Sequence, residues 1–142
     1  MEYYARYEPA GEGSVTITFP DFGWGVSQGD TAEQARQMSE ALLETLIQEH
    51  IDKGDELPRP GRHPGRKYHL VTLSALKNAK AELYNVFRSS GMRKAELARR
   101  LGIPKTNVDR LFDLRHRSRM DQMEAAFAAL NKRLKLAVED AA

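Results

Sequence analysis

Alternating apolar and polar residues predict a small antiparallel sheet in the first part of the chain. Residues 3–7 and 15–19 place apolar side chains at every second position, and the glycine-rich stretch 9–13 between them is typical of a turn. Residues 24–28 predict a third, short strand, and residues 68–73 predict a fourth. We expect the fourth strand to return to the sheet formed by the others.

A long amphipathic helix is predicted between the third and fourth strands. Thr31 followed by Gln34 has the spacing of a capping box, and Gly54 is a stop signal. The apolar positions at helical intervals are Ala35, Met38, Leu42 and Leu46, and the pattern continues to Ile51. We therefore expect one long helix packed on one small sheet.

The chain after Ser74 predicts helices almost to its end. The first of these ends near Gly91, three more helical segments follow, and Ser118 with Asp121 has the pattern of an N-cap for the last. The apolar stripe of the first is Leu76, Ala79, Leu83, Val86 and Phe87. Residues 134–138 alternate in a way that fits a short strand or a continued helix, and a lone strand there would need a partner such as a second copy of the chain.

These elements predict an α+β chain with two small domains. Residues 1–74 would form a small antiparallel sheet with one long helix, and residues 75–142 an all-α domain. The chain of 142 residues is 41% hydrophobic, enough for real cores, and its lack of Cys excludes disulfides and thiol chemistry. It shows neither a secretory leader nor an apolar run of about 18 residues, so we expect a cytoplasmic protein with no membrane contact.

The net charge of +2 conceals an uneven distribution along the chain. Residues 1–61 carry four basic and twelve acidic side chains, whereas residues 62–142 carry eighteen basic and eight acidic ones. A basic half is the electrostatic footprint of a surface that meets phosphates, and an acidic half suits a basic protein partner. Solubility alone would explain either half, but it explains opposite signs on contiguous halves less well.

Residues 94–112, within the basic half, carry the pattern of a helix-turn-helix. Ala98 is small where two helices would cross, Gly102 permits a left-handed turn residue, and Pro104 suits the first turn of the second helix. The apolar positions are Leu97, Leu101, Ile103, Val108 and Leu111. An ordinary helical hairpin in a core is the alternative, and the coincidence with a basic surface favours DNA binding.

The second helix of such a motif enters the major groove with its N-terminal residues against base edges. The candidates for base contacts are Lys105, Thr106, Asn107 and Arg110. Lys and Arg suit guanine and Asn suits adenine, although Arg110 has Asp109 and Asp113 nearby as alternative partners. The candidates for phosphate contacts, which would set affinity and salt dependence, are Arg93, Lys94, Arg115, Arg117 and Arg119.

With both halves in view, the chain resembles the HicB antitoxin family, and the resemblance covers nearly all of it. The segments that carry the resemblance are Tyr4–Tyr7, Ile17–Phe22, Gly25–Thr31, Lys80–Tyr84 and Glu96–Ser118. Many relatives have a ribbon-helix-helix as their second domain. Gly102 and its neighbours favour the helix-turn-helix branch here.

The resemblance implies a partner for each domain. The first would be a partial RNase H-like fold that covers a small basic HicA toxin, an mRNA-cleaving protein with a double-stranded-RNA-binding-like fold, and hides its catalytic histidine. The second would dimerise, with a tetramer as the alternative, and bind a palindromic operator to repress the toxin–antitoxin operon. It implies no cofactor.

No short motif identifies the toxin-facing surface. Asp21, Phe22 and Trp24 are the candidates, because they lie on an irregular loop where a large aromatic side chain would be a suitable anchor. A buried Trp24 that holds the sheet to its helix is an equally good interpretation.

Two other functions remain as alternatives. A metal-dependent nuclease would need several carboxylates that converge on two divalent ions. The acids on the sheet and the helix are Glu2, Glu8, Asp21, Glu33, Glu40 and Glu44, and those on the helix fit a solvated face. We therefore predict no catalytic residues and no metal site. A one-component repressor with a ligand-sensing N-terminal domain is the second alternative, and it would need a roomy pocket in a thin domain.

Overall fold

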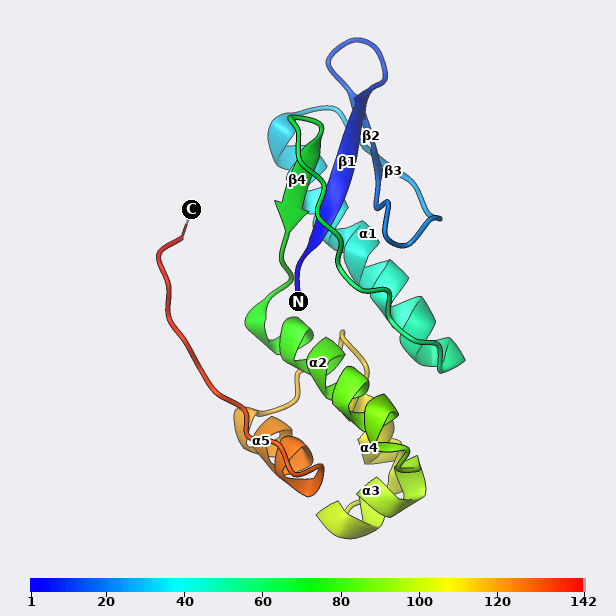
Figure 1. Ribbon diagram of the computed structural model, residues 1–142, viewed down its shortest axis with the longest axis vertical. Coiled ribbons are helices and arrows are strands. Elements are labelled where there is room, and N and C mark those ends of the chain that lie inside the picture. Colours follow the sequence, from blue (N-terminus) through cyan, green and yellow to red (C-terminus); the bar gives the residue numbers. More distant parts are fainter. Residues whose placement is uncertain (142) are drawn as a thin grey trace.

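The computed structural model describes residues 1–141 and has an α+β architecture (Figure 1). The strands are β1 (Tyr3–Pro9), β2 (Val15–Thr18), β3 (Ser27–Gly29) and β4 (Tyr68–Val71). The helices are α1 (Ala32–Lys53), α2 (Ala75–Ser90), α3 (Lys94–Leu101), α4 (Lys105–Leu111) and α5 (Met120–Ala129). We call residues 1–74 the sheet half and residues 75–141 the helical half.

The four strands form one antiparallel sheet in the order β3-β2-β1-β4. The predicted return of the last strand is confirmed, since Tyr3 of β1 lies opposite Val71 of β4. Tyr3 and Ala5 of β1 are buried, as is Ile17 of β2, and these side chains belong to one core with the buried face of α1. Figure 1 shows α1 behind the sheet and no helix on the face turned toward the viewer.

The long helix begins and ends where its caps predicted. The Thr31 hydroxyl accepts the Gln34 N–H at 3.1 Å, the Gln34 side chain accepts the Asp30 N–H, and Gly54 closes the helix in a left-handed conformation. The predicted buried face was partly wrong, because Met38 is 38% exposed. The positions that pack on the sheet are Ala35, Ser39, Leu43, Leu46, Ile47 and Ile51. The buried face includes a polar residue, Ser39, and the apolar spacing therefore predicted the neighbouring Met38 in its place.

Three other predicted boundaries differ from the structure. The third strand covers residues 27–29 instead of 24–28, because Gly25 lies in a left-handed conformation against Leu46 and keeps the preceding segment out of the ladder. The fourth strand ends at Val71. Residues 134–138 belong to neither a strand nor a helix, since the chain after α5 runs in extended, largely exposed form back along the sheet half (Figure 1).

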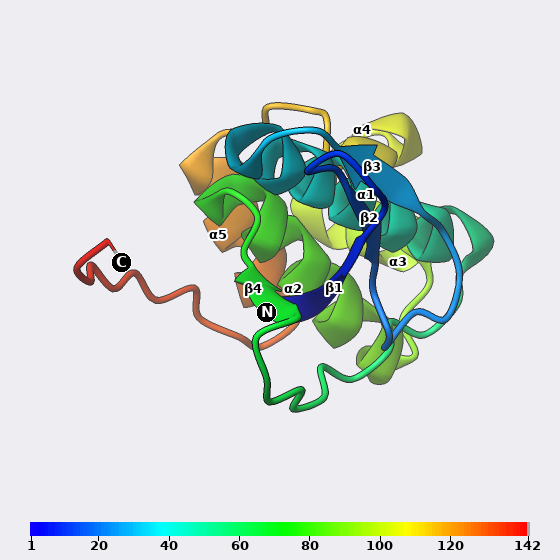
Figure 2. The ribbon, with the colours of Figure 1, turned by 90° about the horizontal axis from the view of Figure 1, so that it is seen from above.

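The helical half packs below the sheet half and shares contacts with it (Figures 1 and 2). The Tyr84 hydroxyl donates to the Asp55 carbonyl at 2.6 Å, and the Lys77 ammonium lies 2.6 Å from the Glu44 carboxylate. Burial raises the pKa of Tyr84, as expected for a phenol held in this contact. No helix in the described part of the chain is long and apolar enough to cross a membrane.

Candidate functional site

Helices α3 and α4 are joined by a tight turn within residues 94–112, the segment for which the sequence pattern predicts a helix-turn-helix. Gly102 ends α3 with a φ of 65°, and the N–H of Ile103 bonds to the Ala98 carbonyl, which turns the chain toward α4. Leu97 and Val108 are fully buried between the helices. One detail was wrong: Pro104 is the N-cap of α4, with extended backbone angles, instead of a residue of its first turn.

The base-facing candidates all belong to α4. Lys105, Thr106 and Arg110 are exposed, and Asn107 is half-buried. A groove of about 350 Å³ between α4 and α5 brings together Asn107, Arg110, His116 and Arg119. In the described structure no ion pair joins Arg110 to Asp109 or Asp113, the two carboxylates that sequence spacing offered as competing partners.

The phosphate candidates fall into three groups. Lys94 pairs with Asp109 of α4 at 2.8 Å, and Arg119 pairs with Asp121 at 3.2 Å. Arg115 faces the sheet half, where its Nε lies 3.9 Å from the Glu44 carboxylate. Arg93 and Arg117 are exposed. Arg119 thus lines the same groove as Asn107 and Arg110, whereas Lys94 and Arg115 lie along a separate groove against α1.

Glu96 changes the charge that α3 presents. Its carboxylate binds Arg99 at 2.6 Å and Arg100 at 3.0 Å, and these contacts lower the pKa of Glu96 to about 2. The carboxylate therefore stays ionised at neutral pH and offsets part of the charge of its two neighbours. The basic side chains available for DNA near α4 are therefore those outside this cluster, such as Arg93, Lys105 and Arg110.

Two polar residues that sequence reasoning missed hold the segment after α4. Lys80 of α2 is fully buried, and its Nζ donates to the Arg110 carbonyl, the Leu111 carbonyl and the Ser118 hydroxyl. Burial lowers the pKa of Lys80 to about 8, so the ammonium form still predominates at pH 7. Ser118 was predicted to cap α5, but Arg119 is the N-cap residue, and the Ser118 hydroxyl accepts a hydrogen bond from Lys80. The lysine within an otherwise apolar stripe was the available signal.

The second missed residue, Gln48, joins α1 to the same segment. Its side-chain oxygen accepts the Leu114 N–H at 2.8 Å, and its nitrogen donates to the Phe112 carbonyl at 3.3 Å. The side-chain amide thus pairs with the backbone much as a neighbouring strand would. No sequence signal separates this glutamine from the exposed polar residues around it.

The three candidates on the loop after β2 have different surroundings. The Asp21 carboxylate accepts from the Gly61 N–H at 3.0 Å and lies 2.9 Å from Nε2 of His63, so it fastens the segment between α1 and β4. Phe22 is half-buried, with its ring centroid 4.9 Å from that of Tyr3. Trp24 is 46% exposed, so the interpretation of a buried Trp24 was wrong. Only Trp24 of the three presents a large free surface.

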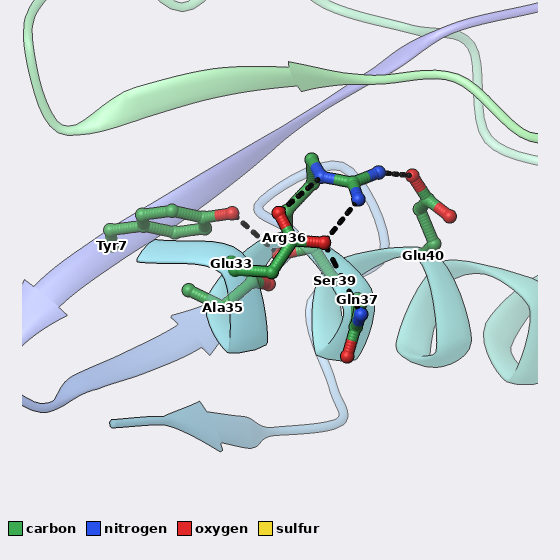
Figure 3. Close-up of polar contacts among 7 residues, drawn as sticks. All are labelled: Tyr7, Glu33, Ala35, Arg36, Gln37, Ser39 and Glu40. Carbon is green, nitrogen blue, oxygen red and sulfur yellow. Dashed lines mark hydrogen bonds and ion pairs between the residues drawn. The ribbon is translucent and has the colours of Figure 1, made fainter. Parts of the chain in front are cut away.

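An open groove of about 910 Å³ lies between the start of α1 and the β1–β4 edge. Its polar groups bind each other: the Tyr7 hydroxyl lies 2.7 Å from Ser39 Oγ, and Arg36 pairs with Glu33 and Glu40 (Figure 3). The Ser39 hydroxyl in turn donates to the carbonyl of Ala35 at 2.6 Å. A ligand entering this groove would find these groups already engaged.

The carboxylates that a two-metal nuclease would need are dispersed. Glu33 and Glu40 bind Arg36, Glu44 binds Lys77, and Asp21 binds His63. Among the described residues, no group of three or more His, Asp or Glu side chains has the arrangement of a metal site. These four acids therefore pair with basic side chains.

Comparison with known proteins covers both halves. A family model described as "HicB_like antitoxin of bacterial toxin-antitoxin system" matches residues 2–82. The chain is 34% identical over 139 residues to Antitoxin HicB 1 of Photorhabdus laumondii, which covers 98% of this chain and 88% of the relative. It is 35% identical over 129 residues to Antitoxin HicB of Pseudomonas fluorescens, covering 91% of this chain and 88% of the relative. Antitoxin HicB of Escherichia coli K12 is 31% identical over 136 residues, 96% of this chain and 98% of the relative.

Proposed function

This chain belongs to the HicB-like antitoxin family of bacterial toxin–antitoxin systems, and from that premise we propose two activities. The sheet half binds and neutralises a HicA-like mRNA-cleaving toxin, and the helical half binds operator DNA and represses the toxin–antitoxin operon. Both are binding activities, without catalysis by this chain. The observation that carries the proposal is the separation of an acidic sheet half, within the family match, from exposed basic side chains on the α3–α4 pair.

The toxin-facing surface that we propose combines charge with an exposed apolar patch on α1 and the loop before β3. Trp24 is 46%, Val26 65% and Met38 38% exposed. The Trp24 ring stacks beside His50, with centroids 6.5 Å apart, and Gly25 lies against Leu46 and Leu42. The loop with Trp24 and Val26 therefore runs along α1 toward Met38, which precedes Leu42 by one turn. Aromatic residues in such patches carry much of the binding energy, and surrounding acids attract a basic partner.

The operator-facing surface is the exposed side of α4. Lys105, Thr106, Asn107 and Arg110 would contact base edges, and Arg93 and Arg117 would contact phosphates, with Lys94, Arg115 and Arg119 in a lesser role because of their acidic neighbours. We propose a homodimer, whose two recognition helices would meet half-sites about 34 Å apart on one side of the duplex. A palindromic operator follows from that symmetry.

The experiment that tests this proposal separates the two activities in the full chain. The small open reading frame beside this gene is co-expressed with the wild type, Trp24→Ala or Arg110→Ala, and growth, co-purification and binding to the promoter duplex are measured. We expect Trp24→Ala to weaken toxin capture by about 2 kcal/mol or more and to leave promoter binding unchanged. Arg110→Ala should reduce preference for the promoter over scrambled DNA by about 1–3 kcal/mol and leave growth rescue intact.

The outcomes discriminate clearly. Loss of growth rescue in Arg110→Ala would contradict the division of labour between the halves. A neighbouring product that is not toxic and does not co-purify would remove the toxin-binding activity, and the ligand-sensing repressor would become the better account. The groove lined by Tyr7, Arg36 and His69 is the place where such a ligand would bind.

A further inference from the structure

A buried lysine in α2 has no part in either surface described above. Lys80 has none of its surface exposed, and lysine is almost never fully buried without partners. Its Nζ donates to the Arg110 carbonyl at 2.6 Å, the Ser118 hydroxyl at 2.7 Å and the Leu111 carbonyl at 3.3 Å. An ammonium group has three N–H donors, so the number of donors equals the number of acceptors.

The two carbonyls belong to the last residues of α4. Carbonyls at a helix C-terminus have no partner within the helix, and the partial negative charge there favours a cation. Lys80 supplies both the hydrogen bonds and the charge from a separate helix. It therefore fixes the C-terminal end of α4 relative to α2.

The third acceptor closes the segment that follows α4. Ser118 is 8% exposed and stands just before α5, so one ammonium group ties the end of α4 to the start of α5. The chain between these two ties carries Arg115 and Arg117. The residue whose carbonyl accepts the shortest of the three bonds, Arg110, presents its side chain to the groove between α4 and α5.

We propose that Lys80 is a positioning residue for operator recognition, holding α4 and the segment after it in the orientation in which Arg110 and its neighbours meet DNA. The proposal rests on the DNA-binding activity proposed above. Lys80 itself lies inside the protein and contacts no phosphate. Its contribution is to sequence discrimination, because hydrogen bonds to DNA bases depend on the placement of α4 more strictly than contacts to DNA phosphates do.

A purely structural lysine would give a different result. If Lys80 only filled volume, Met could take its place with no effect on DNA binding, since Met has a similar length and packs well in irregular apolar sites. The replacement removes the Lys80 donor from two helix carbonyls and a buried hydroxyl, and it leaves the Arg110 carbonyl with only backbone donors such as the Asp113 N–H at 3.3 Å, which loosens the end of α4. Ser118→Ala removes one of the three acceptors with little change in volume, and it is the milder variant of the same contact.

The experiment uses the full chain and two labelled duplexes, the promoter of its own operon and a scrambled sequence of equal length. Binding of wild type, Lys80→Met and Ser118→Ala is measured at several salt concentrations, at a temperature where circular dichroism shows each to be folded. Lys67→Met, the same substitution at an exposed lysine of the sheet half, is the control. We expect Lys80→Met to lower the promoter-to-scrambled affinity ratio about tenfold, Ser118→Ala about threefold, and Lys67→Met not at all.

Salt dependence and toxin capture complete the readout. The salt slope is the change in the logarithm of DNA affinity with the logarithm of salt concentration, and it reflects the counterions released when basic side chains contact phosphates. A buried lysine contacts no phosphate, so we expect the salt slope of Lys80→Met to equal that of the wild type. We also expect toxin capture to be unchanged. A salt slope reduced by about one would identify Lys80 as a phosphate contact and overturn the positioning role.

Each remaining outcome also decides the matter. A folded Lys80→Met with the wild-type affinity ratio overturns the inference and leaves the proposed DNA binding intact. If Lys80→Met does not fold, an unchanged ratio in Ser118→Ala overturns it in the same way. A wild type without preference for its promoter removes the proposed DNA-binding activity, and the inference with it.

Discussion

The two halves of this molecule bury polar groups in different ways. In the sheet half the buried polar contact under the sheet is neutral: the hydroxyls of Tyr7 and Ser39 lie 2.7 Å apart. In the helical half it is charged, with Lys80 fully buried at the end of α4. A hydrogen-bonded ladder satisfies its own backbone groups, whereas the last four carbonyls of a seven-residue helix, more than half of them, need partners from outside the helix. A helix as short as α4 thus requires support from outside, and the sheet does not.

The halves also differ in charge, yet they are not mechanically separate. Gln48 of α1 binds the backbone after α4, and Tyr84 of α2 binds the backbone after α1. The contrast in function that we propose is therefore carried by one packed body. The predictions below test how far the two halves behave as one, beginning with the largest expected effect.

Leu97→Ala should show whether the halves unfold together. Leu97 is fully buried between α3 and α4, so its truncation should lower the free energy of unfolding by about 2–5 kcal/mol. The single tryptophan, Trp24, lies in the sheet half and reports on that half by fluorescence, while circular dichroism reports mainly on the helices. We expect both transitions to shift equally. A fluorescence transition that stays at the wild-type temperature would show that the halves unfold independently.

Gln48→Leu should weaken the connection between the halves. The Leu114 N–H, in a residue that is 1% exposed, loses its acceptor, so we expect a loss of about 1–3 kcal/mol in unfolding free energy by urea denaturation. We also expect weaker promoter binding, since the segment after α4 loses the hydrogen bonds that fix it to α1. Gln37→Leu is the matched control on the same helix, where the side chain contacts only Glu33 at the surface (Figure 3). Equal stability of the two variants would contradict this account.

Tyr7→Phe should have a smaller effect confined to the sheet half. It removes the hydroxyl that meets Ser39 and keeps the ring stacked on His69, with centroids 4.1 Å apart. Ser39 retains its bond to the Ala35 carbonyl, so the expected loss is about 1 kcal/mol in thermal unfolding. Promoter affinity should be unchanged. A change in promoter affinity would connect this groove to DNA binding and favour the ligand-sensing alternative.

Arg117→Ala should have the smallest effect, one on binding alone. Arg117 is an exposed candidate for phosphate contact. Its replacement by Ala should weaken binding to promoter and scrambled DNA alike, and it should reduce the salt slope by about one. Unfolding should be unaffected, in contrast to Gln48→Leu in the same region. A reduced promoter preference would mean that Arg117 reads sequence.

Local patterns predicted much of this structure. The sheet and its last strand, the α1 caps at Thr31 and Gly54, and the buried and turn residues of the α3–α4 pair follow from alternation, spacing and backbone geometry. Three of the candidate base contacts, Lys105, Thr106 and Arg110, are exposed for the same reason: apolar spacing on α4 leaves the other face to solvent. Errors arose where a polar residue takes a core position, as Ser39 does in α1.

The sequence by itself determined the fold class and the charge of each half, because these depend on composition and on periodicities that a short window contains, and its short motifs carried the resemblance to the family. Tertiary structure decided which residues support the end of α4. Lys80 and Gln48 reach it from 30 and 64 positions away along the chain. Their roles depend on which unpaired backbone groups the packing places beside them, and no local pattern records that.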